Sequence, residues 1–488
     1  MFNQYIKIKR KPTLIEALIP FIIMIIVLIY GKGVKGWPTE PLIILIASVA
    51  AIIAFRVGFT WSELMDEISA KVAKGMPAML ILISVGALVG VWRASGTVPI
   101  MIYYGVQIVH PQYLLVTTFI ITAIVSIVTG TSWGSVGTMG VALIGIASGL
   151  GVSLPATAGA IIAGAYLGDK MSPLSDTTNL APLVAGSELY THIKHMMWTT
   201  IPASIISLIV YYIAGLNKNV SGNISSENIN IMLSTLDSMY EWNWLLFVPA
   251  ILILICSILK LPTIPVMISA TALAGIFAIT IQGISFENIL KSMVNGFDID
   301  MISAAGFDAS VAPYEVTRLI NGGGMSAIME TTLLVFCAYC FAGIMTKSGC
   351  LEVILTKLLS VVKSIGGLIT ATVISCITIA LSTGNSYLSI IVPGELFEAA
   401  YKKFGLAPEN LSRTLEDAGT VVVPLIPWAA AAVYMSSVLG VPTIEYLPWA
   451  VLCYTGFLFA IFYGFTEISL KKIPLDNNNC SEQNTPEL

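Results

Sequence analysis

Long apolar runs separated by short polar stretches dominate the pattern along the chain. A helix needs about 20 mostly apolar residues to cross the hydrocarbon core of a bilayer. Runs that meet this requirement cover residues 14–30, 41–57, 76–93, 155–186, 197–215, 243–259, 263–281, 324–346, 411–438 and 447–464. The pattern therefore predicts an all-α polytopic membrane protein with about ten transmembrane helices.

Two further apolar stretches, Gln112–Leu150 and Gly366–Ala400, are too long for one span. Gly, Ser, Thr and Asn residues interrupt them in the middle, at Gly130–Thr138 and Ser382–Tyr387. Backbone that is not helical is tolerated at membrane depth only where protein or a water-filled cavity surrounds it. We therefore interpret each stretch as a re-entrant hairpin.

The positions of Lys and Arg predict the orientation, because basic residues near helix ends concentrate on the cytoplasmic side. If residues 1–12 are inside and each hairpin returns to its own side, most of the other basic residues are inside as well. Both termini are then cytoplasmic, residues 217–242 and 282–323 are external, and the hairpins enter from opposite faces.

A faint internal repetition supports this arrangement. Arg93–Gly96 and Thr346–Gly349 each end a span, a broken hairpin follows each, and Leu167–Asp169 then corresponds to Leu415–Asp417. Inverted repeats with broken helices are typical of secondary transporters. The expected units are N-terminal helices over 13–57, a first repeat over 58–216, an external loop over 217–242, central helices over 243–284, a second inverted repeat over 285–440, a last helix over 441–470 and a cytoplasmic tail over 471–488.

Composition agrees with a lipid-embedded chain, since 56% of the 488 residues are hydrophobic and 11% are charged. Ordinary soluble domains carry about 25% charged residues. The formal net charge of -4 comes from few charges and leaves no basic patch for nucleic acid. The lipid bilayer is the expected environment, and a nucleic-acid partner is not expected.

The segment Gly168–Asn179 concentrates polar residues inside an otherwise apolar region. A charge at the centre of a span costs a few kcal/mol, so function or pairing must compensate for it. Pro173 breaks the helix and frees carbonyls, which with short side-chain oxygens suit a hard cation. Asp169 and Lys170 could instead pair or cap a helix end. The candidate ligands here are Asp169, Ser175, Asp176, Thr177, Thr178 and Asn179.

The hairpin tips supply the other candidate ligands. Thr131 and Ser132 offer neutral oxygens beside Trp133, which could act as a lid or as a packing wedge, although Ser and Thr also bond between transmembrane helices. The second half offers Thr383, Asn385, Asp417 and Thr420, with Glu330 and Glu395 as buried carboxylates that are as readily structural. The expected Na+ ligands are Asp176, Thr131, Asn179 and Asn385.

The runs Gly130–Gly140 and Gly168–Asn179 resemble the signatures of the NhaC-type sodium/proton antiporters, and the resemblance extends over about residues 10–470. It implies a bacterial inner-membrane exchanger of the ion transporter superfamily, with a transport domain that slides past a scaffold, commonly in a homodimer. It implies Na+ as transported ion and no cofactor. Roles in the second half follow from repeat position alone.

The leading interpretation is Na+/H+ antiport, with Asp176 as a shared site and Asp169 in support, because a buried carboxylate can hold a proton or a cation. The second is Na+- or H+-coupled exchange of a small organic acid (malate/lactate-like) or an amino acid, with hairpin helix N-termini, Lys170 or Arg93 binding the anion. No nucleophile–base pair stands out, so an enzyme is not expected. A channel is a third, weaker alternative.

Overall fold

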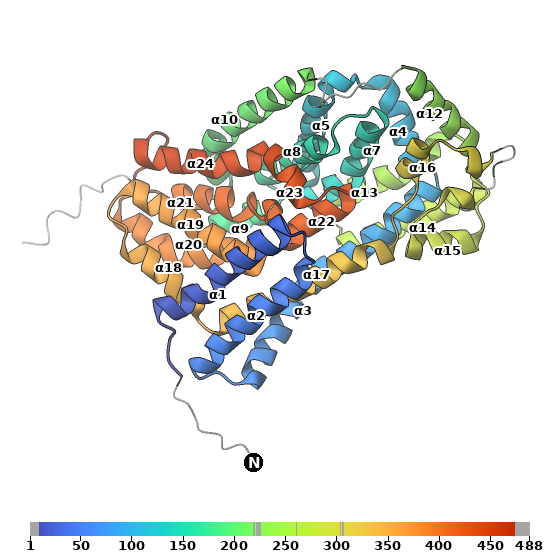
Figure 1. The fold of residues 1–488 in the computed structure, drawn as a ribbon. Helices are drawn as coiled ribbons and strands as arrows, with labels where there is room; N and C mark the ends of the chain where they lie inside the picture. The colour runs from blue at the N-terminus through green and yellow to red at the C-terminus, as the bar shows by residue number, and fades with distance from the viewer. Residues whose placement is uncertain are drawn as a thin grey trace, which may run out of the picture.

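The computed structural model describes residues 9–217, 220, 226–259, 261–302, 304 and 307–473, and every regular element among them is a helix (Figure 1). Within these residues, eight helices are long and apolar enough to cross a membrane, or up to eleven if each of three bent pairs is one span. The predicted all-α polytopic architecture is confirmed. The predicted tail over 471–488 lies outside the described residues from position 474 onward.

Most predicted spans coincide with helices. Their bounds are α1 Leu14–Val27 with a π-helical extension Leu28–Val34, α2 Thr39–Arg56, α3 Trp61–Ala94, α10 Leu189–Leu216, α13 Val248–Ile258, α14 Thr263–Thr280, α17 Met325–Lys347 and α24 Val451–Thr466. The helices α13 and α24 reach span length only as parts of bent pairs. The helix α3 starts well before predicted residue 76, because Thr60 and Glu63 form a capping box that stabilises a polar first turn. Hydropathy alone does not detect such a turn.

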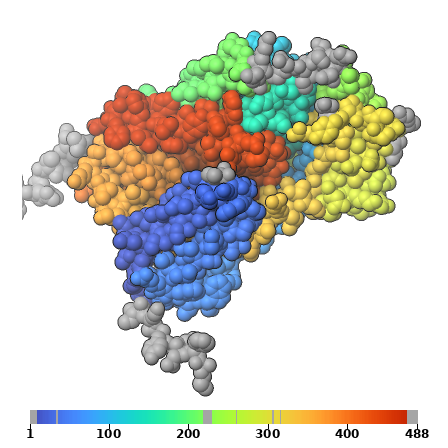
Figure 2. Space-filling view, viewed as in Figure 1, coloured from blue at the N-terminus to red at the C-terminus, as the bar shows by residue number. Residues whose placement is uncertain are grey.

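The helices α3 and α17 pack along each other, and α2, α14 and α15 (Phe286–Asn295) pack against this pair. At Gly343, a Cβ atom would lie 2.9 Å from Cα of Ile68, so the absent side chain lets the two helices approach closely. On the face in Figure 2, the N-terminal helices (blue) lie beside the C-terminal helices (red). Thr39 and Thr443 share a cavity of about 200 Å³ there.

Both predicted hairpins break at their predicted tips. The first consists of α5 Leu114–Thr129, α6 Ser132–Ser135, a π-helical stretch Val136–Gly140 and α7 Val141–Gly149; the second consists of α19 Ile365–Thr383 and α20 Ser386–Lys403. α19 and α20 lie side by side, whereas α5 packs mainly on α8 and α7 packs on α4. The first arms are themselves long enough to span a membrane.

Two helices break as predicted. The first is α8 Leu154–Met171 followed by α9 Asp176–Ala185. The second contains α21 Pro408–Leu415, a π-helical stretch Glu416–Thr420, a 3-10 turn Val423–Leu425 and α22 Ala430–Leu439, with a 47° bend at its break. The breaks leave polar backbone groups inside the protein, where a ligand can reach them.

The two halves repeat the same local construction. Gly130 and Gly384 end the first arms with φ of 70° and 61°, and Thr131 and Asn385 cap the helices that follow. Each arm also accepts a bond from the neighbouring break: Ser172 Oγ donates to Ile127 O at 2.7 Å, and Trp428 Nε1 donates to Leu381 O at 2.7 Å.

The spacing of these caps corrects one detail of the predicted repeat. Gly130 precedes Ser175, the N-cap of α9, by the same number of residues as Gly384 precedes Ala429, the N-cap of α22. In this register Val423, and not Asp417, occupies the position that corresponds to Asp169. The acidic residues of the two halves are therefore not equivalent.

Several short helices lie where the sequence predicts none. The expected external loop 217–242 contains α12 Ser226–Met239. The others are α4 Thr97–Ile108, α16 Tyr314–Ile320, α18 Cys350–Ser360 and α23 Thr443–Tyr446. Each is shorter than a span, so a search for long apolar runs misses it.

Candidate functional site

The two hairpin tips and the two broken helices meet around a cavity of about 390 Å³. This convergence is a property of the fold, because the two hairpins lie in different halves of the chain. Predicted site residues that line the cavity are Thr131, Ser132, Asp169, Ser175, Asp176, Thr177, Asn385 and Thr420. The structure therefore brings together most of the polar residues selected from the sequence.

Asp169 is buried at the end of α8 and is held by the first hairpin tip. Its Oδ2 atom accepts two hydrogen bonds from Ser132, one from the backbone N–H at 3.2 Å and one from Oγ at 2.7 Å. Bonds from neutral donors stabilise a buried carboxylate without neutralising it. Asp169 thus keeps capacity for a cation on its cavity side.

Asp176 lies at the first position of α9 and is exposed to the cavity. Partial positive charge at a helix N-terminus favours a carboxylate there. Tyr387 Oη, at the second hairpin tip, donates to Asp176 Oδ2 at 3.3 Å. This contact links the two repeats directly across the cavity.

Thr131 and Asn385 line the cavity while capping helices. Thr131 Oγ1 accepts a bond from the N–H of Gly134 at 3.3 Å, and Asn385 Oδ1 accepts one from the N–H of Leu388 at 3.1 Å. Such oxygens retain a second lone pair. Both residues can therefore cap a helix and face a cation at once.

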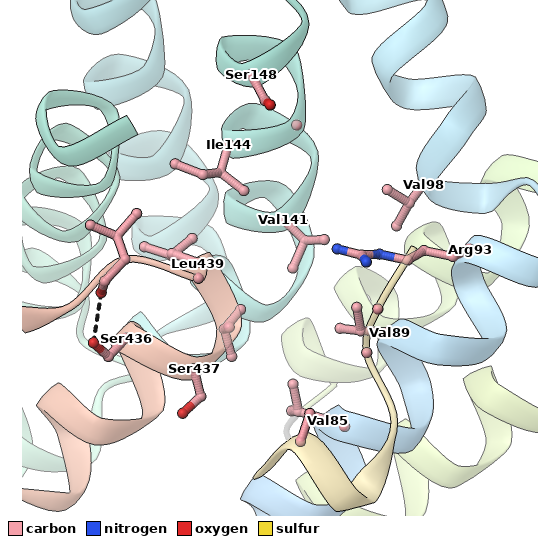
Figure 3. A pocket seen from close by; sticks show the side chains of 18 of the residues that line it. Val85, Val89, Arg93, Val98, Val141, Ile144, Ser148, Ser436, Ser437 and Leu439 are labelled. Carbon is pink, nitrogen blue, oxygen red and sulfur yellow. Dashed lines mark hydrogen bonds between the residues drawn. The ribbon is translucent and has the colours of Figure 1, made fainter. Parts of the chain in front are cut away.

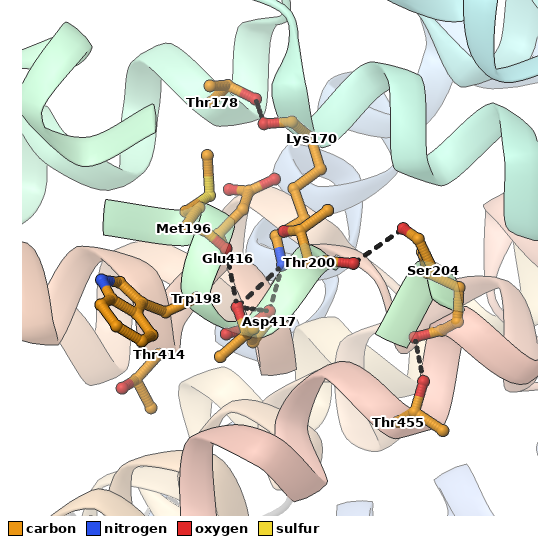
Figure 4. Close-up of polar contacts among 12 residues, drawn as sticks. Lys170, Thr178, Met196, Trp198, Thr200, Ser204, Thr414, Glu416, Asp417 and Thr455 are labelled. Atoms are coloured by element: carbon orange, nitrogen blue, oxygen red, sulfur yellow. Dashed lines mark hydrogen bonds and ion pairs between the residues drawn. The ribbon is translucent and has the colours of Figure 1, made fainter. Parts of the chain in front are cut away.

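Asp417 is not on the cavity wall, which corrects the prediction that it is a ligand there. It is fully buried, and its Oδ1 atom forms an ion pair with Lys170 Nζ and accepts a bond from Thr199 Oγ1 at 3.2 Å (Figure 4). Lys170 pairs with the second repeat, not with neighbouring Asp169. Removing one partner of a buried ion pair is strongly destabilising, so this pair joins α8 firmly to the second broken helix.

Glu416 is a buried carboxylate that sequence reasoning did not select. Thr177 Oγ1 donates to its Oε1 atom at 3.1 Å, and Oε2 has no hydrogen-bond partner in the described part of the chain. Thr420, one turn later, also has an unpartnered hydroxyl among the described residues. In the sequence, a carboxylate inside an apolar span indicates a functional residue, but the prediction chose the neighbouring Asp417 instead of Glu416.

Three other predicted residues do not face the cavity. Thr178 Oγ1 donates to the carbonyls of Asp169 and Lys170, and Asn179 Nδ2 donates to those of Pro173 and Ser175, so both brace the break between α8 and α9. Thr383 Oγ1 donates to Ile379 O within its own helix. The hydroxyls of Thr178 and Thr383 are used locally, whereas Asn179 lies outside the cavity lining and its expected role as a Na+ ligand stays a prediction.

Glu330 and Glu395 are exposed and line other cavities, so the prediction that they are buried carboxylates is wrong. Trp133 stacks on Tyr434 with ring centroids 4.4 Å apart, and Tyr434 Oη donates to its carbonyl. Trp133 therefore acts as a packing wedge. Residues on the 390 Å³ cavity, called the ion cavity below, that the sequence analysis did not select include Lys74, Tyr166, Tyr339 and Tyr387.

The donor set of the cavity consists mainly of hydroxyl, amide and carboxylate oxygens. Among the described residues, no group of three or more His, Cys, Asp or Glu could hold a metal ion. A tightly bound transition metal therefore has no ligand set in this part of the chain. Mixed neutral and anionic oxygens suit a weakly held hard cation that must also leave.

Comparison with known proteins identifies the family. Residues 5–177 and 164–468 match the Na+/H+ antiporter family. The chain belongs to this family. An uncharacterized Na+/H+ antiporter of Haemophilus influenzae is 47% identical over 464 residues, covering 95% of this chain and 98% of that protein. The resemblance seen in the two motifs is thereby confirmed.

Two further members of the family are similar over nearly their full length. The Na+/H+ antiporter NhaC of Alkalihalophilus pseudofirmus is 35% identical, covering 95% of this chain and 98% of that protein. A malate-2H+/Na+-lactate antiporter of Bacillus subtilis is 33% identical, covering 94% of this chain and 95% of that protein. The relatives of this chain are thus named for different cargo, Na+ and H+ in one case and malate and lactate in the other.

Proposed function

We propose that this chain is a secondary transporter that exchanges Na+ for H+ across the bacterial plasma membrane. The observation that carries the proposal is the placement of Asp169 and Asp176 in one cavity, at the junction of two broken helices and two hairpin tips. Family membership supports the same activity. Both termini are proposed to be cytoplasmic, and the homodimer stays a prediction from the resemblance.

In the cavity, oxygen atoms of the protein are proposed to replace the water molecules that surround Na+. Asp169 supplies a carboxylate fixed by Ser132, while Asp176 is exposed to the cavity and contacts only Tyr387 by hydrogen bond among the described residues. A carboxylate with few fixed donors can bind either a proton or a cation, because each neutralises the same charge. Asp176 is accordingly the proposed exchange site, and Asp169 positions the ion.

Alternating access is proposed from the relation of two cavities to α3. The ion cavity contacts the middle of α3 at Lys74, Pro77 and Ile81, whereas a larger cavity contacts the part that follows, at Val85 and Arg93. At 1.5 Å rise per residue, Lys74 and Arg93 are roughly 28 Å apart along the helix axis. Movement of the tips along α3 would carry the ion site from one cavity toward the other.

The test is ion flux in proteoliposomes that contain the purified chain. A pulse of external Na+ should drive H+ out of the lumen and raise luminal pH, and K+ should not. The Asp176→Asn variant should lose at least nine-tenths of this flux, whereas Asp66→Asn, outside the cavity on α3, should retain it. Sodium-driven flux at the wild-type rate in Asp176→Asn would contradict the site, and its absence in the wild type would contradict the function.

A second candidate is Na+- or H+-coupled exchange of a small organic acid or an amino acid. It is favoured by similarity to a relative named as a malate-2H+/Na+-lactate antiporter. The same proteoliposomes distinguish the two: uptake of labelled organic acid or amino acid that requires a Na+ or H+ gradient would support this candidate. Na+-driven pH change without any added organic substrate supports Na+/H+ exchange.

A further inference from the structure

A second cavity of about 590 Å³ lies between α3 on one side and α7 and α22 on the other (Figure 3). Its walls are largely apolar, with Val85 and Val89 facing Ile144 and Leu439 across the space. This volume falls in the range of small-molecule sites, which combine apolar walls with a few polar groups. The cavity does not share the carboxylates of the ion site.

Arg93 brings a positive charge into this cavity from the end of α3. Its guanidinium points across the cavity toward Val141 of α7. The Nη1 atom donates to the backbone carbonyls of Asn321 and Ile320, while the buried Nε atom has no partner within the described residues. Arg93 is half-buried and forms no ion pair with a carboxylate among the described residues. A charge partly removed from water normally has an anionic partner.

The rest of the lining strengthens the positive character. A second guanidinium, from exposed Arg318, lies on the same cavity, and no Asp or Glu belongs to the described lining. A hydroxyl group comes from Ser148 of α7, whereas Ser437 of α22 donates its proton to Val433 O and contacts Thr331. The cavity therefore offers cationic and hydroxyl donors together with apolar surface.

The position of Arg93 is fixed by a run of glycines. Gly322, Gly323 and Gly324 all have positive φ, and a Cβ atom on Gly322 would lie 2.6 Å from Nη1 of Arg93. Any other residue at position 322 would displace the guanidinium or strain the loop. The charged group is thus held in place before a ligand arrives, which lowers the entropy cost of binding.

We propose that this cavity binds a small organic carboxylate. The guanidinium of Arg93 would pair with the carboxylate, since planar charge-assisted bonds suit that geometry. The valine, isoleucine and leucine side chains would cover a short carbon chain, and the Ser148 hydroxyl would bond to a further oxygen. This cavity holds neither Asp169 nor Asp176, and the inference rests on the second candidate function, because it names where an organic acid would bind.

The test is calorimetric titration of the purified full-length chain with acetate and succinate as N-methylglucamine salts, with phosphate and chloride for comparison. At least one carboxylate should bind saturably. Arg93→Gln should weaken that binding at least tenfold, and Arg93→Lys should weaken it less, because the charge remains. The matched control is Arg56→Gln, an exposed arginine that pairs with Glu16 on another helix and should bind as the wild type does.

Two further variants test the site if Arg93→Gln does not fold and separate it from the Na+ site. Ser437→Asp places a competing carboxylate on the cavity wall and should abolish binding even if Arg93→Gln fails to fold. Asp176→Asn should leave binding unchanged, which separates failure of this inference from failure of Na+/H+ exchange. Absence of saturable carboxylate binding, wild-type affinity in a folded Arg93→Gln, or equally tight binding of phosphate would overturn the proposal.

Discussion

At the scale of single residues, Asp169 and Asp176 flank one helix break yet have different surroundings. Asp169 is buried and accepts two bonds from Ser132, whereas Asp176 is exposed to the cavity and accepts one from Tyr387. Two like carboxylates in different environments can take different roles. The buried residue holds a fixed geometry, and the exposed residue is free to exchange its partner.

We expect Ser132→Ala to raise the Na+ concentration for half-maximal flux by about tenfold, since a hydrogen bond to a charged group contributes about 1.5–3 kcal/mol. The backbone N–H of residue 132 still bonds Asp169, so transport should not vanish. Flux is measured against Na+ concentration in proteoliposomes. Ser84→Ala is the control, because Ser84 Oγ is exposed and bonds its own helix. Equal half-maximal concentrations in both variants would show that Ser132 does not position Asp169 for Na+.

Lys170→Met should lower the stability of the protein by about 3–5 kcal/mol, because it leaves Asp417 buried without its cationic partner. The double variant Lys170→Met with Asp417→Leu should recover much of that loss, since no unpaired charge remains. Thermal unfolding in detergent measures both effects.

The control for this pair is Lys402→Met. Lys402 pairs with Glu398 on an exposed helix face, and such pairs contribute about 0.3–0.5 kcal/mol. If Lys170→Met melted at the same temperature as Lys402→Met, the buried pair would not stabilise the contact between the repeats.

At the scale of elements, the sequence predicts features that neighbouring residues determine, such as helix breaks, but not contacts between distant segments. Gly130 and Gly384 end helices at the predicted tips because a glycine and a capping residue act within one turn. The partner of Lys170 lies in the other half of the chain, so no local pattern reveals it. Glu416 differs, because a carboxylate inside an apolar span is a local signal, although its contact with Thr177 exists only after folding.

Gly130→Ala should reduce flux more than stability. The substitution costs roughly 1–2 kcal/mol for a left-handed backbone. The new Cβ would also lie 2.6 Å from Cβ of Leu174, in the break between α8 and α9, and would displace it. Gly405→Ala is a matched control with φ of 69° and no atom within 4 Å of the added Cβ.

Both variants should lose stability in thermal unfolding, Gly130→Ala more because of its contact with Leu174, but only Gly130→Ala should lose most of its Na+-driven flux. Equal flux in the two variants would mean that contact between the hairpin tip and the break is not needed for transport.

At the scale of the whole molecule, α3 and α17 form one packed unit, with α19 and α22 packed against α17 and α22 also in contact with α3. α22 belongs to the second broken helix and contributes to the walls of both cavities. Thr331 of α17 and Ser437 of α22 have hydroxyl oxygens 2.9 Å apart across this boundary. If the site moves relative to α3 and α17, this contact must break in each cycle.

Replacing Thr331 and Ser437 together by cysteine should therefore allow oxidation to stop transport. Side chains this close bring two sulfur atoms within reach of a disulfide. Flux should fall to background after oxidation and return after reduction, whereas each single cysteine variant should transport under both conditions. Normal flux in a fully crosslinked sample would show that α17 and α22 do not separate during exchange.

The ion pair between Lys170 and Asp417 has a further consequence during synthesis. The two residues are 247 positions apart in the chain. At about 5–20 residues per second, Lys170 would leave the ribosome roughly 12–50 s before its partner. During that interval the first half must enter the bilayer with an uncompensated ammonium group. Until Asp417 is synthesised, Lys170 has no partner. A stalled or truncated chain would therefore expose an unpaired charge that membrane quality control can recognise.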